Sequence, residues 1–104
     1  MNSRILPEAT ADADAVEYRL DREQSGLGFD FLLLYRAAVI AIRATPLLHS
    51  PTEDGPAGIE TREVFIERFN QRVIYAVTDT EVVILAVVHA YRRPGSWAAR
   101  TERV

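Results

Sequence analysis

The sequence predicts an α+β domain in the order β-α-α-β-β-β, in which a helical hairpin packs on one face of a mainly antiparallel sheet. Three observations predict this fold. Apolar residues recur every three or four positions through residues 7–24 and again through 29–44, which is the period of a helix face. Prolines and glycines then make residues 46–58 a non-helical connection. Beyond it, in residues 64–91, apolar residues alternate or run continuously, as they do in strands.

The helical part begins after a short run, Ser3–Leu6, which predicts a brief edge strand. Pro7 suits the first turn of the helix expected at 7–24, and the glycines of Ser25–Gly28 end that helix. The second helix is expected at 29–44. Its apolar stripe is wide enough to lie against a sheet as well as against the first helix.

Three runs of strand character follow, namely Val64–Phe69, Val73–Val77 and Val82–Tyr91, with turn-like links at 70–71 and 78–80. The last run is apolar on both faces, which is typical of a strand covered on both sides or paired centrally. We expect one parity of this run to pack against the second helix. The expected contacts of Phe31, Tyr35 and Ile42 are either Val83, Leu85 and Val87 or the alternate set Val82, Ile84 and Ala86. The other face of the sheet is expected to be open for binding.

Composition places the chain among ordinary globular domains. Its 104 residues are 48% hydrophobic and 26% charged, which suits one domain spanning 1–104. Without cysteine there is neither a disulfide nor a thiolate site, and no residue spacing suggests a metal site, so no metal and no cofactor are expected. The N-terminus lacks the apolar core of a signal peptide, and the longest apolar stretch is interrupted by arginines, so a cytoplasmic location away from membranes is expected.

Charge is distributed unevenly along the chain. All 12 basic residues are arginine, which excludes any mechanism that needs a lysine ammonium. Residues 1–61 hold 5 arginines and 10 acids, whereas residues 62–104 hold 7 arginines and 5 acids. The second part can therefore attract phosphate or a carboxylate-rich partner segment, although an acidic helical face that only keeps the protein soluble explains the same asymmetry.

Three strings in this order resemble the RelE/ParE toxin superfamily, and most closely the branch called plasmid stabilisation proteins. They are Ser25–Leu32 between the helices, Arg68–Tyr75 across the first sheet turn, and Val82–His89 followed by Arg92–Trp97. The resemblance covers nearly the whole chain. It implies the toxin of a type II toxin-antitoxin system, neutralised by an antitoxin segment that lies across its surface. ParE-like members act on DNA gyrase, whereas RelE-like members cut messenger RNA in the ribosome, and fold alone does not choose between them.

A RelE-like ribonuclease must activate a ribose hydroxyl, stabilise phosphorane-like charge and protonate the leaving oxygen. Without lysine, the chain can imitate only relatives that use Glu, Arg, His and Tyr. The candidate glutamates are Glu63 and Glu67, and the other candidates are Arg68, Arg72, His89 and Tyr91. Each has a plainer interpretation as solvated charge beside a hairpin or as a polar strand end.

For partner binding, the best candidates are Arg92, Arg93 and Trp97, because arginine and tryptophan are enriched among interface anchors. Trp97 can equally fold back onto the protein's own core. The apolar edge of the last strand is a further candidate for antitoxin docking or a homodimer.

The sequence therefore favours a ParE-like toxin that binds gyrase and is not an enzyme. The alternatives are a ribosome-dependent messenger RNA endoribonuclease and a repurposed relative without toxicity. The negative net charge and the missing lysines favour the gyrase binder over the nuclease.

Overall fold

The computed structural model describes all 104 residues, Met1–Val104, and confirms the predicted α+β order. Three elements were not expected: a two-residue strand inside the long loop, a 3-10 helix at residues 67–69, where the expected strand was to continue, and a 3-10 helix at the C-terminus. The elements in chain order are β1 (Asn2–Ile5), α1 (Pro7–Glu23), α2 (Leu27–Ala44), β2 (Ser50–Pro51), β3 (Glu60–Ile66), the 3-10 helix η1 (Glu67–Phe69), β4 (Gln71–Val77), β5 (Glu81–His89) and the 3-10 helix η2 (Ala98–Arg103).

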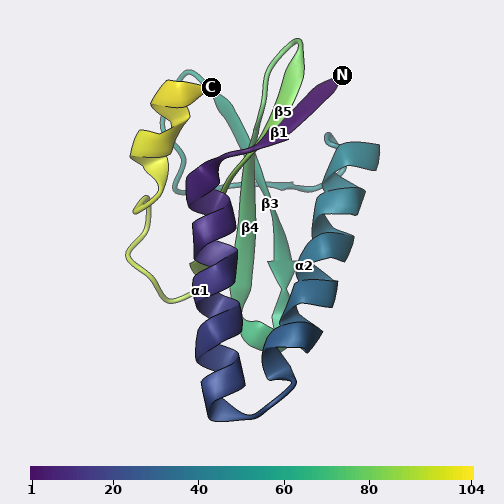
Figure 1. Cartoon of the computed structure of the whole chain (residues 1–104). Helices are drawn as coiled ribbons and strands as arrows, with labels where there is room; N and C mark the ends of the chain where they lie inside the picture. The colour runs from purple at the N-terminus through teal and green to yellow at the C-terminus, as the bar shows by residue number, and fades with distance from the viewer.

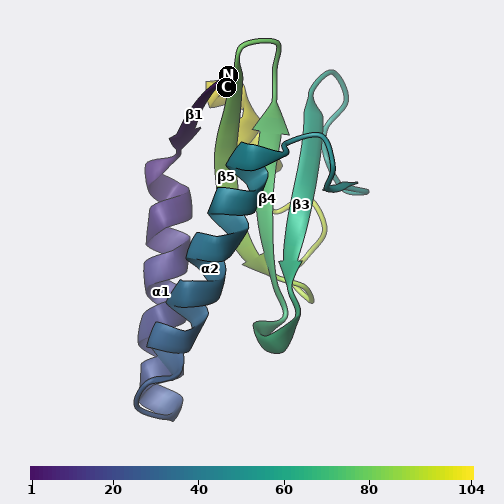
Figure 2. The same ribbon diagram turned by 90° about the vertical axis from the view of Figure 1, so that its right-hand side faces the viewer.

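The five strands form one sheet in the order β1-β5-β4-β3-β2. β1 pairs with β5 in parallel, and every other pair is antiparallel. The helical hairpin covers one face of this sheet (Figures 1 and 2). Because β5 lies between β1 and β4, the prediction of an apolar edge on the last strand is wrong, and residues 82–88 are all buried.

Glycine lets the two helices turn and approach each other. Gly26 adopts a left-handed φ of 94° between them, which is a conformation that side chains disfavour. At Gly28 a Cβ atom would lie 2.5 Å from the backbone oxygen of Glu17, so only glycine fits against α1 there. The Gly28 N–H donates to Asp21 at 2.8 Å and ties the start of α2 to α1.

A β-bulge at Leu85 changes which side chains of β5 face the helices. Ile74 pairs with Ala86 and Tyr75 pairs with Ile84, so Leu85 has no partner on β4. Neither predicted parity set is therefore correct as a whole. The helix-facing residues of β5 are Val82, Ile84 and Val87, which join one core with Phe31, Tyr35 and Ile42, whereas Val83, Leu85, Ala86 and Val88 face the other way.

The second face of the sheet also carries a core, so the prediction of an open binding face is wrong. The C-terminal segment crosses this face on the side opposite the helices (Figure 2). Trp97 is 1% exposed, and it packs there with Leu6, Ile74 and the outward residues of β5. Two hydrophobic layers thus enclose β5, one under the helices and one under Trp97.

A carboxylate and a guanidinium replace a missing strand beside the bulge. Pairing with β1 ends near Ile84, whose carbonyl accepts the Leu6 N–H at 3.0 Å. Beyond that point Asp12 of α1 accepts the Val87 N–H at 3.0 Å. Arg100 of η2 donates to Asp12 at 2.6 Å and to the Leu85 carbonyl at 3.0 Å. This cluster satisfies backbone groups that would otherwise be unpaired and fastens η2 to α1.

No helix in the structure combines the length and the apolar character needed to cross a membrane.

We predict that Asp12→Ala lowers the free energy of unfolding by about 1–3 kcal/mol, because it removes the acceptor of the Val87 N–H and leaves Arg100 without its carboxylate. Urea denaturation followed by circular dichroism measures this loss. Asp14→Ala is the matched control, since Asp14 is exposed on the same helix and its change should alter stability by less than about 0.5 kcal/mol. Equal effects of the two substitutions would contradict the fastening role of Asp12.

Candidate functional site

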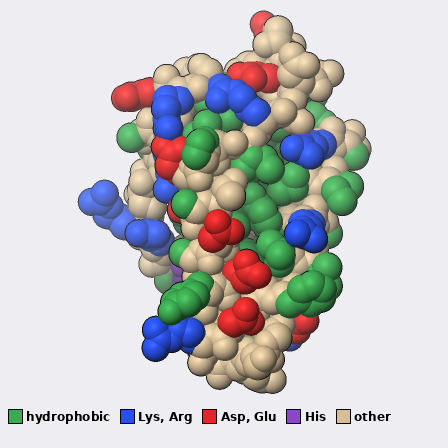
Figure 3. All heavy atoms as spheres, viewed as in Figure 1, with side chains coloured by type: hydrophobic (Ala, Val, Ile, Leu, Met, Phe, Trp, Pro, Cys, Tyr) green, Lys and Arg blue, Asp and Glu red, His purple; other side chains and the backbone are tan.

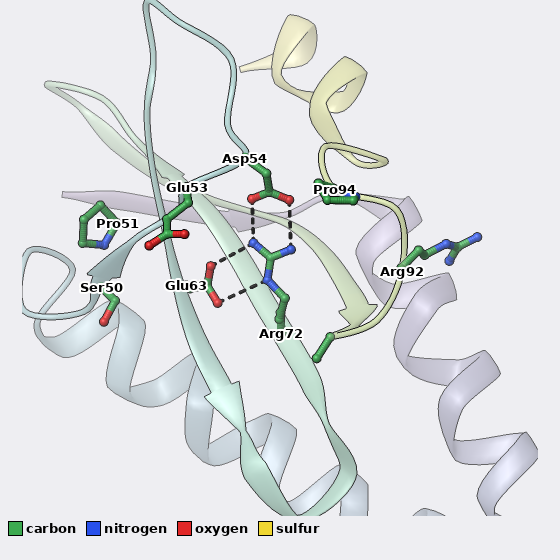
Figure 4. Close-up of a pocket in the computed structure, with 9 residues that line it drawn as sticks. Ser50, Pro51, Glu53, Asp54, Glu63, Arg72, Arg92 and Pro94 are labelled. Carbon is green, nitrogen blue, oxygen red and sulfur yellow. Dashed lines mark hydrogen bonds and ion pairs between the residues drawn. The ribbon is translucent and has the colours of Figure 1, made fainter.

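The most densely bonded polar cluster of the molecule centres on Arg72 of β4. Its guanidinium donates to both carboxylate oxygens of Asp54, Nη1 to Oδ2 at 3.0 Å and Nη2 to Oδ1 at 2.7 Å. It also donates to Glu63 of β3, with Nε to Oε2 at 3.2 Å and Nη2 to Oε1 at 2.8 Å. Figure 4 shows Arg72 between the two carboxylates. Only 15% of the Arg72 side chain is exposed, so its two carboxylate partners and the surrounding chain cover most of it.

Asp54 joins three parts of the chain that are distant in sequence. Besides Arg72, its Oδ2 accepts the Gly95 N–H at 2.9 Å and the Trp97 Nε1–H at 3.2 Å. Hydrogen bonding from Arg72, helped by those from Gly95 and Trp97, holds the pKa of Asp54 far below its usual range. The two carboxylates correspondingly raise the pKa of Arg72. We call Asp54, Glu63 and Arg72 the outer ion cluster.

The outer ion cluster forms one wall of a cavity of about 600 Å³, between the loop that precedes β3 and the segment that follows β5. Three carboxylates line it, those of Glu53, Asp54 and Glu63. Arg92 also lines the cavity, but its side chain points away from the cluster (Figure 4). Because Arg72 already makes four hydrogen bonds to carboxylates, it has little capacity left for a phosphate.

The candidate nuclease residues are divided among different parts of the structure. Arg72 faces the C-terminal segment, whereas His89 lines a second cavity, of about 390 Å³, next to Asp12 of α1. Arg68 lies in η1, where it pairs with Asp30 of α2 at 3.1 Å. Two pairs of candidates come together: His89 and Tyr91, with ring centroids 5.2 Å apart, and Arg72 with Glu63 in the outer ion cluster. Of the two glutamates considered, Glu63 is held by Arg72, and Glu67 lies in η1 with no ion pair.

His89 and Tyr91 do not both lie in the last strand, which was expected to extend to Tyr91. Strand β5 ends at His89, and Tyr91 lies in the turn beyond it, 84% exposed. The Tyr91 N–H donates to His89 Nδ1 at 3.1 Å, which brings the two rings together.

The residues predicted to bind a partner lie in two different environments. Arg92 and Arg93 are exposed, and neither forms a salt bridge. Arg92 lines both cavities, because the turn that follows β5 passes between them. Trp97, by contrast, lies in the protein's own core, which was the alternative to a role as an interface anchor.

Sequence reasoning missed the outer ion cluster and the pairing of Asp12 with Arg100. A signal for part of the cluster was available, since Phe65 pairs with Arg72 and places Glu63 two residues away on the same face of β3. No comparable signal marked Asp54, which lies in an irregular loop, or Asp12, which is one of several acids on α1.

We predict that Asp54→Asn destabilises the fold at pH 7 by about 1–3 kcal/mol, because a neutral amide cannot accept the charged hydrogen bonds of Arg72 equally well. Glu53→Gln is the matched control, because Glu53 is exposed beside it and should change stability little. Urea denaturation with Trp97 fluorescence measures both variants.

The difference between wild type and Asp54→Asn should also depend on pH. Because the pKa of Asp54 is lower in the folded state than in the unfolded chain, its contribution is complete at neutral pH. The contribution is lost as pH falls below about 4, where the unfolded chain binds a proton more readily. The stability gap should therefore narrow between pH 6 and pH 3, and a constant gap would contradict the assignment.

Comparisons with known proteins found a likeness among solved structures. No protein-family model matches the chain, and no curated protein matches it. Among solved structures, the chain is similar to one from the chromosomal ParDE toxin-antitoxin system of P. aeruginosa, with a TM-score of 0.62. The sequence identity is 19%, over 86% of this chain and 95% of that chain. In agreement with the RelE/ParE resemblance of its sequence, the chain thus shares the fold of a chain from a ParDE toxin-antitoxin system.

Proposed function

We propose that this chain is the toxin of a type II toxin-antitoxin pair, that it binds DNA gyrase as ParE-like toxins do, and that a cognate antitoxin neutralises it. The observation that carries the proposal is the shared fold, which extends over most of both chains. At 19% sequence identity, this likeness supports a shared fold and does not identify the target. The target is therefore argued from the chemistry of this chain's own residues.

The arrangement of the arginines supports a binder over a nuclease. Phosphoryl chemistry needs a cation near an acid-base group, within reach of the same reacting phosphate. Here the guanidinium of Arg72 is bound to two carboxylates, and His89 lines a different cavity. Moving Arg72 to a phosphate would leave Asp54 and Glu63 without their counter-charge, which is costly at a shielded site.

One observation favours the nuclease as the second candidate. His89 and Tyr91 are in contact, and Arg19 and Arg92 line the same cavity as His89. An imidazole, a phenol and two guanidiniums are the group types that a lysine-free ribonuclease would use. This alternative involves neither Arg68 nor Arg72.

Arg92 and Arg93 are suited to the antitoxin. Both are exposed on an irregular segment and have no carboxylate partner of their own, so a carboxylate-rich partner segment can pair with them without breaking existing bonds.

We predict that induced expression of the chain blocks DNA replication and triggers the DNA-damage response before translation slows. The His89→Ala variant should retain this toxicity, because surface complementarity rather than proton transfer carries binding. Thymidine and methionine incorporation, with sequencing of transcript ends, provide the measurements. Transcript cleavage at ribosomal positions that falls roughly a hundredfold or more in His89→Ala would establish the nuclease instead. A chain that harms cells in neither assay would support the repurposed relative.

We also predict that Arg92→Ala with Arg93→Ala slows association with the antitoxin by roughly threefold to tenfold at low salt, and by less as salt rises, because exposed charges mainly steer encounter. Surface plasmon resonance with the product of the adjacent reading frame measures these rates. Arg22→Ala on α1 is the matched control, because Arg22 is exposed and lines neither cavity. An association rate equal to that of the wild type at every salt concentration would remove Arg92 and Arg93 from the interface.

A further inference from the structure

The outward face of α2 is apolar to a degree that the fold of this chain does not require. Eight residues of the helix are exposed, and six of them are apolar. The exposed residues are Phe29, Leu33, Leu34, Arg36, Ala37, Ile40, Arg43 and Ala44. On α1, by contrast, most exposed residues are polar or charged. A surface helix normally buries one apolar stripe and presents a polar face to water, whereas α2 is apolar on both sides.

The exposed apolar side chains form a continuous stripe along the helix. Phe29, Leu33, Ala37, Ile40 and Ala44 follow one another at intervals of three or four residues, so they share one face for about 22 Å. Phe29 is 57% exposed and Ile40 is 67% exposed. Beyond the helix end, Leu47 and Leu48 add further exposed apolar surface. We call the five helical residues the outer stripe.

The outer stripe has no partner within the chain. The opposite face of α2 already supplies the core, through Phe31, Tyr35 and Ile42. In Figure 2 the helix lies in front of the sheet with no other element over it. Figure 3 shows hydrophobic side chains gathered over α2, with positive side chains among them. Contiguous exposed apolar surface of this kind marks an interaction site.

Positive charge borders the outer stripe along one edge. Arg36 and Arg43 are seven residues apart, so both lie in one row along the same edge of the stripe. Both are exposed, and neither forms a salt bridge. Asp30 is the one acid of α2, and it lies at the other edge, where Arg68 already pairs with it.

We propose that the outer stripe binds an amphipathic helix of a partner protein, and that this helix carries a matching apolar stripe with glutamate or aspartate along one edge. Two helices can pack at 8–10 Å with their apolar side chains interdigitated, while the partner's carboxylates reach Arg36 and Arg43. The proposal rests on the proposed function only in naming the antitoxin as the source of this helix. The surface itself is inferred from this chain alone.

A second copy of the chain fits the same surface less well. If two copies paired antiparallel about a two-fold axis, the symmetry would place Arg36 and Arg43 beside the same row of the other copy, and the like charges would repel. A parallel pair would offer the arginines only Asp30, at the far end of the helix and already engaged. An acidic helix meets both requirements of the surface, because it supplies apolar area and negative charge on the correct edge.

The test uses two synthetic helical peptides of 21 residues with leucines at three-and-four spacing. One carries glutamates along one edge of the leucine stripe, and the other carries lysines at the same positions. Fluorescence anisotropy with the full-length chain should show binding of the glutamate peptide at least tenfold tighter than that of the lysine peptide. Arg36→Glu with Arg43→Glu should reverse this preference, and Leu33→Asp with Ile40→Asp should abolish binding of both peptides.

Arg19→Glu with Arg22→Glu on α1 is the matched control, and it should leave the preference for the glutamate peptide unchanged. Circular dichroism confirms that each variant is folded. Equal binding of the two peptides, no binding of either, or a preference that survives charge reversal would overturn the proposal. Two further outcomes would overturn it. One is a dimer of the wild-type chain in analytical ultracentrifugation that is lost in the Leu33→Asp variant, and the other is binding to anionic lipid vesicles without binding to either peptide.

The outcome is separable from that of the proposed function, because peptide binding requires no toxicity. If the chain is toxic to cells but binds neither peptide, this inference is overturned and the toxin proposal is retained. A harmless chain that selects the glutamate peptide would retain it while contradicting the toxin proposal. Where both hold, the product of the adjacent reading frame should compete with the glutamate peptide for the chain.

Discussion

Strand β5 is apolar on both faces, and the rest of the structure must cover it twice. The helical hairpin covers one face, and the segment around Trp97 covers the other. The second cover is small, because it consists of irregular chain and a 3-10 helix, so apolar contact alone holds it weakly. Charged hydrogen bonds supply the remaining attachment. Asp54 holds Gly95 and Trp97, and Asp12 holds Arg100, so the two ends of the cover are fixed by carboxylates from other elements.

Because carboxylates attach the C-terminal segment to the sheet, the arginines that bind these carboxylates are not available for catalysis. A guanidinium bound to two shielded carboxylates is a structural group, and withdrawing it would leave both charges uncompensated. Arg72 is held in this way, and Arg100 is held by one carboxylate, that of Asp12, together with the Leu85 carbonyl. Arg36, Arg43, Arg92 and Arg93 form no salt bridge. Apart from Arg22 on α1, the arginines without a salt bridge lie on two surfaces, the outer face of α2 and the turn after β5. Both surfaces are suited to an acidic protein partner.

The periodicity of the sequence was enough to predict the helices, the three long strands and their order. Those elements have long apolar patterns, and the period of a pattern follows directly from backbone geometry. The second cover could not be predicted in the same way, because residues 90–104 have no period and bind through single contacts such as Trp97 with Asp54. The outer ion cluster could not be predicted for a related reason. Parity predicts which residues share a face of a regular strand. One of the two partners of Arg72, Asp54, lies in a loop, and the bulge at Leu85 alters the parity of β5.

The bulge also affects how this chain can be compared with others. An extra residue in β5 means that inward and outward positions after Leu85 are offset by one from those in a strand without a bulge. An alignment that runs through β5 without a gap would match core positions of one chain with positions on the opposite face of the other. Residues such as His89 and Arg92 would then be equated with the wrong neighbours, and a single-residue gap at Leu85 restores the correspondence.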